Sequence, residues 1–433
     1  MTSNKKNKAA FLWDESFLWG LMAYKALCTS GLPFELIRAE DIRKGALDEY
    51  PMLFVPGGWA SNKSGALGEK GLDAIRQFVE KGGSYLGFCG GAGLATNARG
   101  CLGLLDVDRK PTNERVPSFS GRIELKLHEH EIWTADSPAV ISKDSIEDDL
   151  PIVTHKTSGI YHAWWPSQFT IKDSNIKVLA SYGKAMPDSF SSDLNVGDVR
   201  NSCSWHELEE QYKINLDPGK LFDEPAVIEG KYGRGRVMIS LVHFDTQGDP
   251  EGAQALERIW SYLGGLVPAS EKNTATVVSC GREKDAVRVA GELYAISREL
   301  VSLGERNFLW FWRNAMLLHW RRGVRGLEYN TLFIMIREIF EQARNGSDIS
   351  VDDLKMIRRP LKEFALKAAK LLVLERFEMQ KGNFMTFADC DNPEVRVLRG
   401  ELFSASKSHG GRFKELLDIT DSCLIRILTG NEG

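Results

Sequence analysis

Short apolar runs alternate with amphipathic segments through the first hundred residues of the chain. Two of these segments, 17–31 and 68–83, have apolar residues at helical spacing and end in glycine, which favours two helices. The apolar runs have the length and the neighbours of buried strands; they are 9–14, 34–39, 51–58 and 84–89. This β–α–β order predicts a parallel, doubly wound sheet with right-handed crossovers.

The pattern changes after residue 120. Residues 121–133 alternate between apolar and polar positions, as an antiparallel strand does, and 158–169 are dense in aromatic residues. Residues 176–183 and 225–245 indicate three more strands, the last two forming a hairpin that turns at 232–236. A helix is expected over 250–266. These segments predict antiparallel strands that complete the α/β domain.

The last third of the chain is predicted to be helical. Residues 267–285 are rich in serine, threonine and lysine and are interpreted as a linker. Most of 286–433 has apolar residues at helical spacing. The aromatic segment 308–320 is interpreted as a buried or interfacial helix, because it is too short and too charged to span a membrane. We therefore expect a flavodoxin-like, mostly parallel α/β domain over 1–266, followed by an all-α domain over 286–433.

Composition narrows the class of protein. The 433 residues carry a net charge of −4 and are 43% hydrophobic, which is typical of a globular protein and gives no case for nucleic acid or membrane binding. The seven cysteines are scattered, odd in number and without a CxxC pair, so neither a disulfide framework nor a zinc ribbon is indicated. A reducing cytoplasm fits this usage, and no metal site is predicted.

One cysteine lies between glycines at a predicted strand–helix junction. The stretch Gly87-Phe88-Cys89-Gly90-Gly91 has the context of a nucleophile elbow, in which small neighbours allow strained backbone angles at the nucleophile. The start of the following helix favours a thiolate, and the N–H of Gly90 can donate to an oxyanion. The alternative is a buried thiol in a glycine-rich bend.

A second oxyanion donor is expected at the end of the neighbouring strand. Gly57 and Gly58 follow the apolar run 51–55, at the edge of the sheet where open α/β folds place their sites. We expect Gly58 and Gly90 to form the oxyanion pair. Trp164, in the aromatic segment, is a candidate for the wall of the substrate pocket and equally a candidate for the core.

A thiol nucleophile needs a base and an acid that orients the base. His243 follows the apolar run 237–242 at another strand end, and Asp245 is two residues further on. This spacing can place the carboxylate on the imidazole nitrogen that faces away from the thiol. Alternatively, His243 is an ordinary strand-end histidine and Asp245 caps the next helix. Glu251 is a spare carboxylate for the orienting role.

These motifs together resemble the class I glutamine amidotransferases. The match is nearest to the amidotransferase-like domain at the N-terminus of biotin–protein ligases and to stand-alone bacterial forms of it. It rests on "FVPGGW", "FVEKGGSYLGFCGGAGLA", "GIYHAWWPSQF" and "VIEGKYGRGRVMISLVHFD", which span roughly residues 9–266. The resemblance implies a triad that falls on Cys89, His243 and Asp245. The family usually has Glu at the last position, and many glutaminases have Gln where this chain has Gly93.

The leading functional expectation is cysteine-dependent amide hydrolysis or amidotransfer on a small substrate. The alternative is a catalytically inactive, ligand-binding or regulatory scaffold whose helical domain carries the interaction. No P-loop is present and the glycines at 90–93 lack the Rossmann spacing, so neither ATP nor NAD is implied and no cofactor is expected. If ammonia is released, a synthetase or another protein partner is expected as a separate chain.

Overall fold

The computed structural model describes five stretches of the chain, residues 5–134, 155–268, 283–382, 385–386 and 390–430. The chain divides into two compact units, Met1–Glu271 and Lys272–Gly433. Each unit is described separately below.

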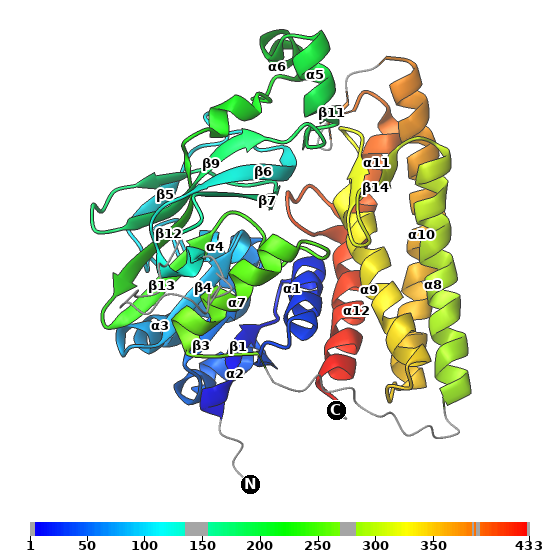
Figure 1. The fold of residues 1–433 in the computed structure, drawn as a ribbon. Coiled ribbons are helices and arrows are strands. Elements are labelled where there is room, and N and C mark those ends of the chain that lie inside the picture. Colours follow the sequence, from blue (N-terminus) through cyan, green and yellow to red (C-terminus); the bar gives the residue numbers. More distant parts are fainter. Residues whose placement is uncertain (1–4, 135–154, 269–282, 383–384, 387–389, 431–433) are drawn as a thin grey trace, which may run out of the picture. The chain divides into compact units, whose positions relative to one another are not determined.

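The first unit is built on one large mixed sheet (Figure 1). Its strands are β1 (Ala9–Leu12), β2 (Phe34–Ile37), β3 (Met52–Val55), β4 (Ser84–Phe88), β6 (Phe119–Leu127), β7 (Ser158–Trp164), β9 (Lys177–Ala185), β10 (Phe190–Ser191), β11 (Leu194–Asn195), β12 (Pro225–Tyr232) and β13 (Gly235–Ser240). A separate pair is formed by β5 (Val107–Arg109) and β8 (Phe169–Ile171). The helices are α1 (Phe17–Thr29), α2 (Ala39–Arg43), α3 (Ala60–Glu80), α4 (Gly90–Leu94), α5 (Val196–Ser202), α6 (Trp205–Tyr212) and α7 (Pro250–Gly264).

Five neighbouring strands, in the order β2-β1-β3-β4-β13, run parallel to one another. This is the flavodoxin-like order, in which the chain winds outward from β1 in both directions. Aromatic side chains link α1 and α7 to the same face of the sheet: Tyr24 packs on Phe34, and Trp260 packs on Phe54. The predicted doubly wound α/β fold is confirmed.

The other strands extend the sheet beyond β13 in antiparallel fashion. Their order is β13-β12-β9-β6-β10-β11, and β7 also pairs with β6 but lies outside this order. The predicted hairpin is present, because Tyr232 at the end of β12 pairs with Gly235 at the start of β13. The antiparallel strands lie beside β13, so they flank the edge of the sheet that carries the candidate site.

The second unit is helical except for one hairpin. Its helices are α8 (Glu283–Arg306), α9 (Gly326–Arg344), α10 (Val351–Gln380), α11 (Pro393–Phe403) and α12 (Gly411–Thr429), and its strands are β14 (Trp310–Trp312) and β15 (Leu318–Trp320). The rings of Phe364, Phe403 and Phe413 pack against one another in its core. Because α8 begins at Glu283, the expected linker over 267–285 is too long at its C-terminal end; residues 269–282 lie outside the described residues.

The expected helix over 308–320 is wrong, because this segment forms the hairpin β14–β15. Phe308 has a φ of 55°, which interrupts the helical path after α8. The side-chain oxygen of Asn314 then accepts from the N–H groups of Met316 and Leu317, both at 2.8 Å, and closes the turn. Trp310 is buried while Phe311 is exposed, which is the two-residue period of a strand.

None of the helices in the described stretches combines the length and the apolar character needed to cross a bilayer.

Candidate active site

The candidate residues come together at the carboxyl ends of three neighbouring parallel strands. β13, β4 and β3 are adjacent in the sheet. His243 lies three residues after β13, Cys89 directly after β4, and Gly57 and Gly58 directly after Pro56 at the end of β3. The sheet therefore brings four predicted site residues to one edge, as parallel α/β folds do with their sites.

Cys89 occupies a strained turn. Its φ of 49° and ψ of −101° lie outside the regions that L-residues favour. Its N–H donates to Ser240 O at 2.8 Å, which ties the turn to β13, and the residue is only partly buried. The glycine neighbours are required by packing: a Cβ on Gly91 would lie 1.9 Å from Val55 O, and one on Gly87 would lie 2.6 Å from the backbone of Gly91. With five residues, α4 adds little dipole of its own.

The two predicted oxyanion donors are in direct backbone contact. A Cβ on Gly90 would lie 1.9 Å from Gly58 O and 3.0 Å from Gly58 N. Within the described residues, no backbone hydrogen bond uses the N–H of Gly58 or Gly90. Gly58 has a φ of 118°, so glycine is also needed there for its backbone conformation. The backbones of the two glycines thus meet at the carboxyl ends of β3 and β4.

His243 and Asp245 form a buried pair. Nδ1 of His243 lies 2.9 Å from Oδ1 of Asp245, and both side chains are 0% exposed. Burial lowers the pKa of His243, but the charge and hydrogen bond of Asp245, together with the nearby Cys89, outweigh burial and raise it to about 10. Nε2 of His243 is buried and makes no hydrogen bond within the described residues. Nε2, the imidazole nitrogen that faces away from Asp245, is therefore open to a group on the side of Cys89.

Two other carboxylates, at the start of α7, have partners of their own. Asp249, not Asp245, is the N-cap of α7: its Oδ1 accepts from Gly252 N at 2.9 Å, and its Oδ2 lies 2.7 Å from Nδ1 of His162. Glu251 is paired with Lys156 at 2.7 Å. Asp245 is thus neither a helix cap nor a surface carboxylate, and it is the one that reaches His243.

Trp164 is buried behind the site rather than beside the imidazole. It is 2% exposed, and its indole N–H donates to Thr246 Oγ1 at 3.0 Å. The ring that packs on His243 is Trp19 of α1, with ring centroids 4.9 Å apart, and Trp165 packs on Trp19 at 6.0 Å. Sequence reasoning missed Trp19, although its place in the first turn after β1 puts it at the same edge of the sheet.

A buried lysine supports the glycine loop, and the sequence analysis missed it as well. Lys63 is 0% exposed, and its Nζ donates to Asp14 O at 3.2 Å and to the hydroxyl of Ser16. A Cβ on Gly58 would lie 3.3 Å from Lys63 Cε and 2.5 Å from Glu15 O. Lys63 thus joins the loop after β1 to the loop after β3, beneath the candidate oxyanion donors.

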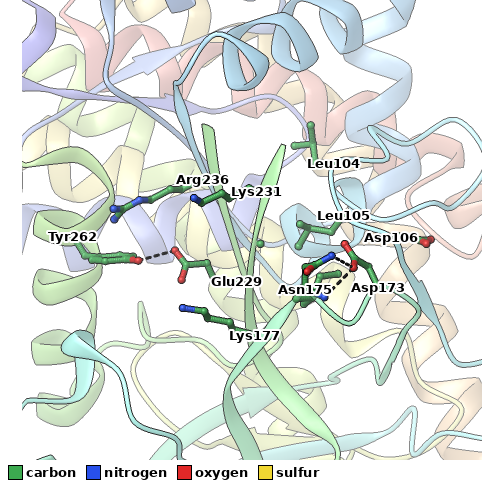
Figure 2. Close-up of a pocket in the computed structure, with 12 residues that line it drawn as sticks. Leu104, Leu105, Asp106, Asp173, Asn175, Lys177, Glu229, Lys231, Arg236 and Tyr262 are labelled. Carbon is green, nitrogen blue, oxygen red and sulfur yellow. Dashed lines mark hydrogen bonds between the residues drawn. The ribbon is translucent and has the colours of Figure 1, made fainter. Parts of the chain in front are cut away.

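Two cavities of about 530 Å³ among the described residues lie elsewhere. Figure 2 shows the first, where Tyr262 donates to Glu229 Oε1 at 2.8 Å and Arg236 lies 4.5 Å from the ring of Tyr262. Arg236 is near the start of β13, whereas His243 follows its end. No candidate site residue lines this cavity. In the described part of the chain, no group of three or more His, Cys, Asp or Glu side chains is arranged to hold a metal ion.

Part of the first unit matches a known protein family. Residues 42–99 match the family model described as "Biotin-protein ligase, N terminal". This segment includes Gly58, Cys89 and Gly90, whereas His243 and Asp245 lie outside it. The resemblance to that family, expected from the sequence, is confirmed over these residues. No curated protein matches the chain.

Three similar solved structures can be named. The first is a glutamine amidotransferase, 18% identical, with 60% of this chain and 99% of that chain covered and a TM-score of 0.36. The second is PurLQS from Thermotoga maritima, 15% identical, covering 59% and 98%, with a TM-score of 0.38. The third is a β-galactosidase from Bacillus circulans sp. alkalophilus, 13% identical, covering 61% and 32%, with a TM-score of 0.35.

Proposed function

We propose that the first unit is a cysteine-dependent amide hydrolase or amidotransferase for a small substrate. Cys89 is the nucleophile, His243 the acid–base residue and Asp245 the residue that orients it. The proposal is supported above all by the buried His243–Asp245 pair, which leaves Nε2 of the imidazole free on the side of a half-buried cysteine at a strained turn.

In the first step the Cys89 thiolate attacks the carbonyl carbon of the amide. A C–S bond forms, and the electron pair of the C=O bond moves to oxygen. Its negative charge is met by the N–H groups of Gly58 and Gly90, whose backbones are in contact and which have no backbone acceptor within the described residues. His243 takes the proton of the thiol before the attack, which the raised pKa of its imidazole favours.

In the second step the C–N bond breaks and His243 gives its proton to the departing nitrogen. The product is a thioester on Cys89 and a free amine or ammonia. Water or an acceptor amine then loses a proton to His243 and attacks the thioester, which releases the acyl group and restores the thiol–imidazole pair. Atoms and charge balance without a cofactor.

Asp245 is one methylene shorter than the glutamate usual in the resembling family, yet its Oδ1 is 2.9 Å from the imidazole. The shorter side chain therefore still reaches the imidazole. The carboxylate fixes which imidazole nitrogen faces the cysteine and stabilises the imidazolium.

The proposal is tested by the rate at which iodoacetamide alkylates Cys89 as a function of pH, followed by intact mass and peptide mapping. Cys28 and Cys203 are exposed and serve as internal references. We expect Cys89 to react at least about tenfold faster than either near pH 6, because an imidazolium favours the thiolate. His243→Ala should remove the difference. Equal rates for the three cysteines, unchanged by His243→Ala, would reject a catalytic site and favour a ligand-binding scaffold.

Turnover is tested next with glutamine and other small primary amides, by measuring ammonia release. Cys89→Ser should abolish release, since a serine hydroxyl has a much higher pKa than a thiol and is a far weaker nucleophile in a site built for sulfur. Ammonia release that persists in the Cys89→Ser protein would exclude Cys89 as the nucleophile.

A further inference from the structure

The indole ring of Trp19 lies against the imidazole ring of His243. The two ring centroids are 4.9 Å apart and the ring planes are inclined by 34°. A Cβ on Gly57 would lie 3.0 Å from Cβ and Cγ of Trp19 and 3.1 Å from Cε1 of His243, so the loop after β3 meets both rings at one point. The absence of a side chain at Gly57 therefore leaves the two rings room to pack on each other.

The carboxylate of Asp245 does not fix the imidazole by itself. Its Oδ1 lies 2.9 Å from Nδ1 of His243, but its Oδ2 is buried and has no hydrogen-bond partner within the described residues. The second oxygen therefore does not anchor the carboxylate. One hydrogen bond to Nδ1 also leaves the imidazole free to tilt about the axis of that bond, because hydrogen bonds tolerate a range of angles. A ring packed on the face of the imidazole restricts this tilt.

The loop that carries Trp19 is strained and held by buried polar contacts. Between β1 and Trp19, Glu15 has a φ of 54° and Phe17 a φ of 46°, although neither is glycine. Such angles persist in large residues only where the surrounding structure enforces them. Here the hydroxyl of Ser16 accepts from the buried Nζ of Lys63, and the carbonyl of Ser16 accepts from Trp19 N at 2.9 Å. These contacts fix where α1 begins and therefore where Trp19 lies.

We propose that Trp19 is a positioning residue, whose ring holds the imidazole of His243 in the orientation that turns Nε2 towards Cys89. The use of this orientation in catalysis rests on the proposed function, whereas the holding of the ring does not. Asp245 selects the tautomer of the imidazole, and Trp19 sets the tilt of its ring. A displacement of about 1 Å in a catalytic group can lower a rate about a hundredfold, so the tilt matters for the chemistry.

The proposal is tested by a double-mutant cycle on the alkylation of Cys89 by iodoacetamide near pH 6. The proteins compared are the wild type, Trp19→Leu, His243→Ala and the double variant. Trp19→Leu should lower the rate about tenfold when His243 is present, and less than about twofold when His243→Ala is already in place. Equal losses in the two backgrounds would mean that Trp19 supports the region in general, which would overturn the positioning role.

Trp260→Leu is the matched control. Trp260 is 0% exposed and packs on Phe54 of the same sheet at 5.4 Å between ring centroids, so the same substitution removes a buried indole that does not touch His243. The control should react within about twofold of the wild type. Trp19→Phe keeps an aromatic ring against the imidazole and should retain most of the reactivity. A loss in Trp260→Leu as large as in Trp19→Leu, or equal losses in Trp19→Phe and Trp19→Leu, would overturn the role.

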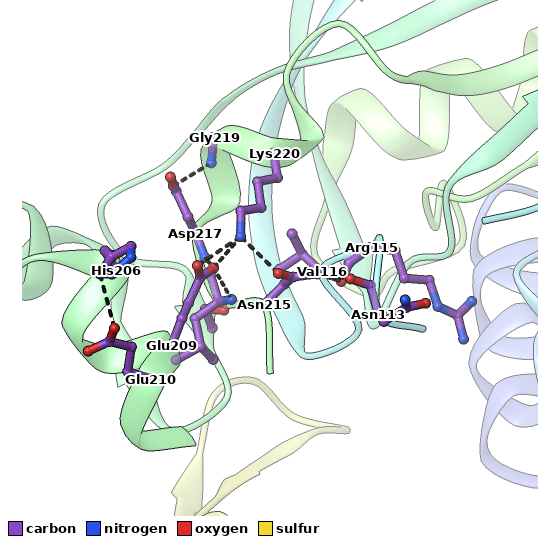
Figure 3. Close-up of polar contacts among 12 residues, drawn as sticks. Asn113, Arg115, Val116, His206, Glu209, Glu210, Asn215, Asp217, Gly219 and Lys220 are labelled. Carbon is purple, nitrogen blue, oxygen red and sulfur yellow. Dashed lines mark hydrogen bonds and ion pairs between the residues drawn. The ribbon is translucent and has the colours of Figure 1, made fainter. Parts of the chain in front are cut away.

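Proton NMR of the imidazole N–H provides a readout of the ring itself. A buried, hydrogen-bonded N–H exchanges slowly with water, whereas an exposed one exchanges fast. His206 is the exposed reference: its side chain is 80% exposed and its Nδ1 lies 3.8 Å from Oε1 of Glu210 (Figure 3). The Nδ1–H of His243, assigned by its loss in His243→Gln, should exchange at least about tenfold faster in Trp19→Leu than in the wild type. Equal exchange in the two proteins, or no protected signal in the wild type, would overturn the inference.

The outcomes separate this inference from the proposed function. If His243→Ala leaves the reactivity of Cys89 unchanged, the catalytic proposal fails, and exchange of the imidazole N–H alone decides whether Trp19 holds the ring. If His243→Ala lowers the reactivity but Trp19→Leu acts equally with and without His243, the catalytic proposal stands and the positioning role is overturned. Should Trp19→Leu not fold, Gly57→Ala replaces it, because its Cβ would press on both rings. Wild-type exchange and reactivity in Gly57→Ala would then overturn the role.

Discussion

A methyl group on Gly90 would lie 1.9 Å from the carbonyl oxygen of Gly58. The turn after β4 and the loop after β3 are therefore in backbone contact, and this contact sets the separation of the two candidate oxyanion donors. No side chain mediates it, so the geometry depends on the absence of Cβ atoms rather than on any particular contact.

Gly90→Ala should push the two loops apart and remove the reactivity of Cys89 towards iodoacetamide. We expect a loss of more than about 2 kcal/mol in the free energy of unfolding, because backbone atoms cannot move aside as a flexible side chain can. Gly65→Ala in α3 is the control: nothing lies within 4 Å of its Cβ position, so it should be neutral or stabilise the protein by up to about 1 kcal/mol. Denaturant unfolding with alkylation kinetics measures both; equal effects of the two substitutions would contradict the steric argument.

Asp245→Asn should lower the pKa of His243, because the charge of Asp245 holds that pKa near 10. A raised histidine pKa stabilises the folded protein fully below about 6.5, and this contribution is lost as the pH rises towards 10. The variant should thus show a weaker loss of stability between pH 7 and pH 10, and a Cys89 alkylation rate at least about tenfold lower at pH 6. Glu251→Gln, which leaves His243 untouched, is the control. An Asp245→Asn protein with wild-type pH dependence would show that the carboxylate has no electrostatic role.

Lys63→Met should loosen the loops beneath Gly58. The substitution leaves the carbonyl of Asp14 without its donor, at a cost of about 1–3 kcal/mol in unfolding free energy. It should also slow the alkylation of Cys89, since Lys63 touches the loop that carries the oxyanion donors. Lys70→Met, at an exposed position of the same helix, should change neither quantity. If both variants behave alike, Lys63 is not a support of the site.

In the helical unit, burial raises the pKa of Glu375 to about 7, although Arg399 donates to it at 2.8 Å. A carboxyl whose folded-state pKa is raised stabilises the fold fully below its unfolded pKa of about 4.3, and this contribution is lost as the pH rises through 7. The effect is on the order of 3 kcal/mol. Between pH 5 and pH 8, hydrogen exchange of peptides from α10 should therefore become faster in the wild-type protein than in the Glu375→Gln variant. The Glu363→Gln variant, changed on the exposed side of α10, should show the same pH dependence of exchange as the wild-type protein. If the difference in exchange rate between wild type and Glu375→Gln does not change with pH, the pKa of Glu375 is not raised.

The strands of the parallel sheet could be predicted because each is a continuous apolar run bounded by glycine, proline or charged residues, as in 51–58. The segment 308–320 could not, because its dense aromatic residues fit the helical period and the two-residue period equally well. The segment forms a hairpin rather than a helix because the side chain of Asn314 closes a tight turn. In the sequence this turn is visible only as two polar residues, Arg313 and Asn314, within an apolar segment.

In the candidate site, the sequence indicates those residues that lie at or just after the end of an apolar run. Cys89 and His243 each end an apolar run, and Asp245 follows at short spacing. Trp19 and Lys63 lie on separate segments, and only the winding of the sheet brings them to this edge. Their spacing along the chain carries no signal, because it is set by the lengths of the intervening helices.

The crowded glycines also affect how related sequences should be interpreted. Gly87, Gly90 and Gly91 are fixed by close backbone contacts, so selection for a stable fold alone would preserve them after any chemistry had been lost. Cys89 is under no such constraint: it is only partly buried, and serine or alanine would fit the same turn. Among homologues, retained glycines therefore report on ancestry, whereas retention of the cysteine together with the histidine that follows β13 would report on continuing selection for activity.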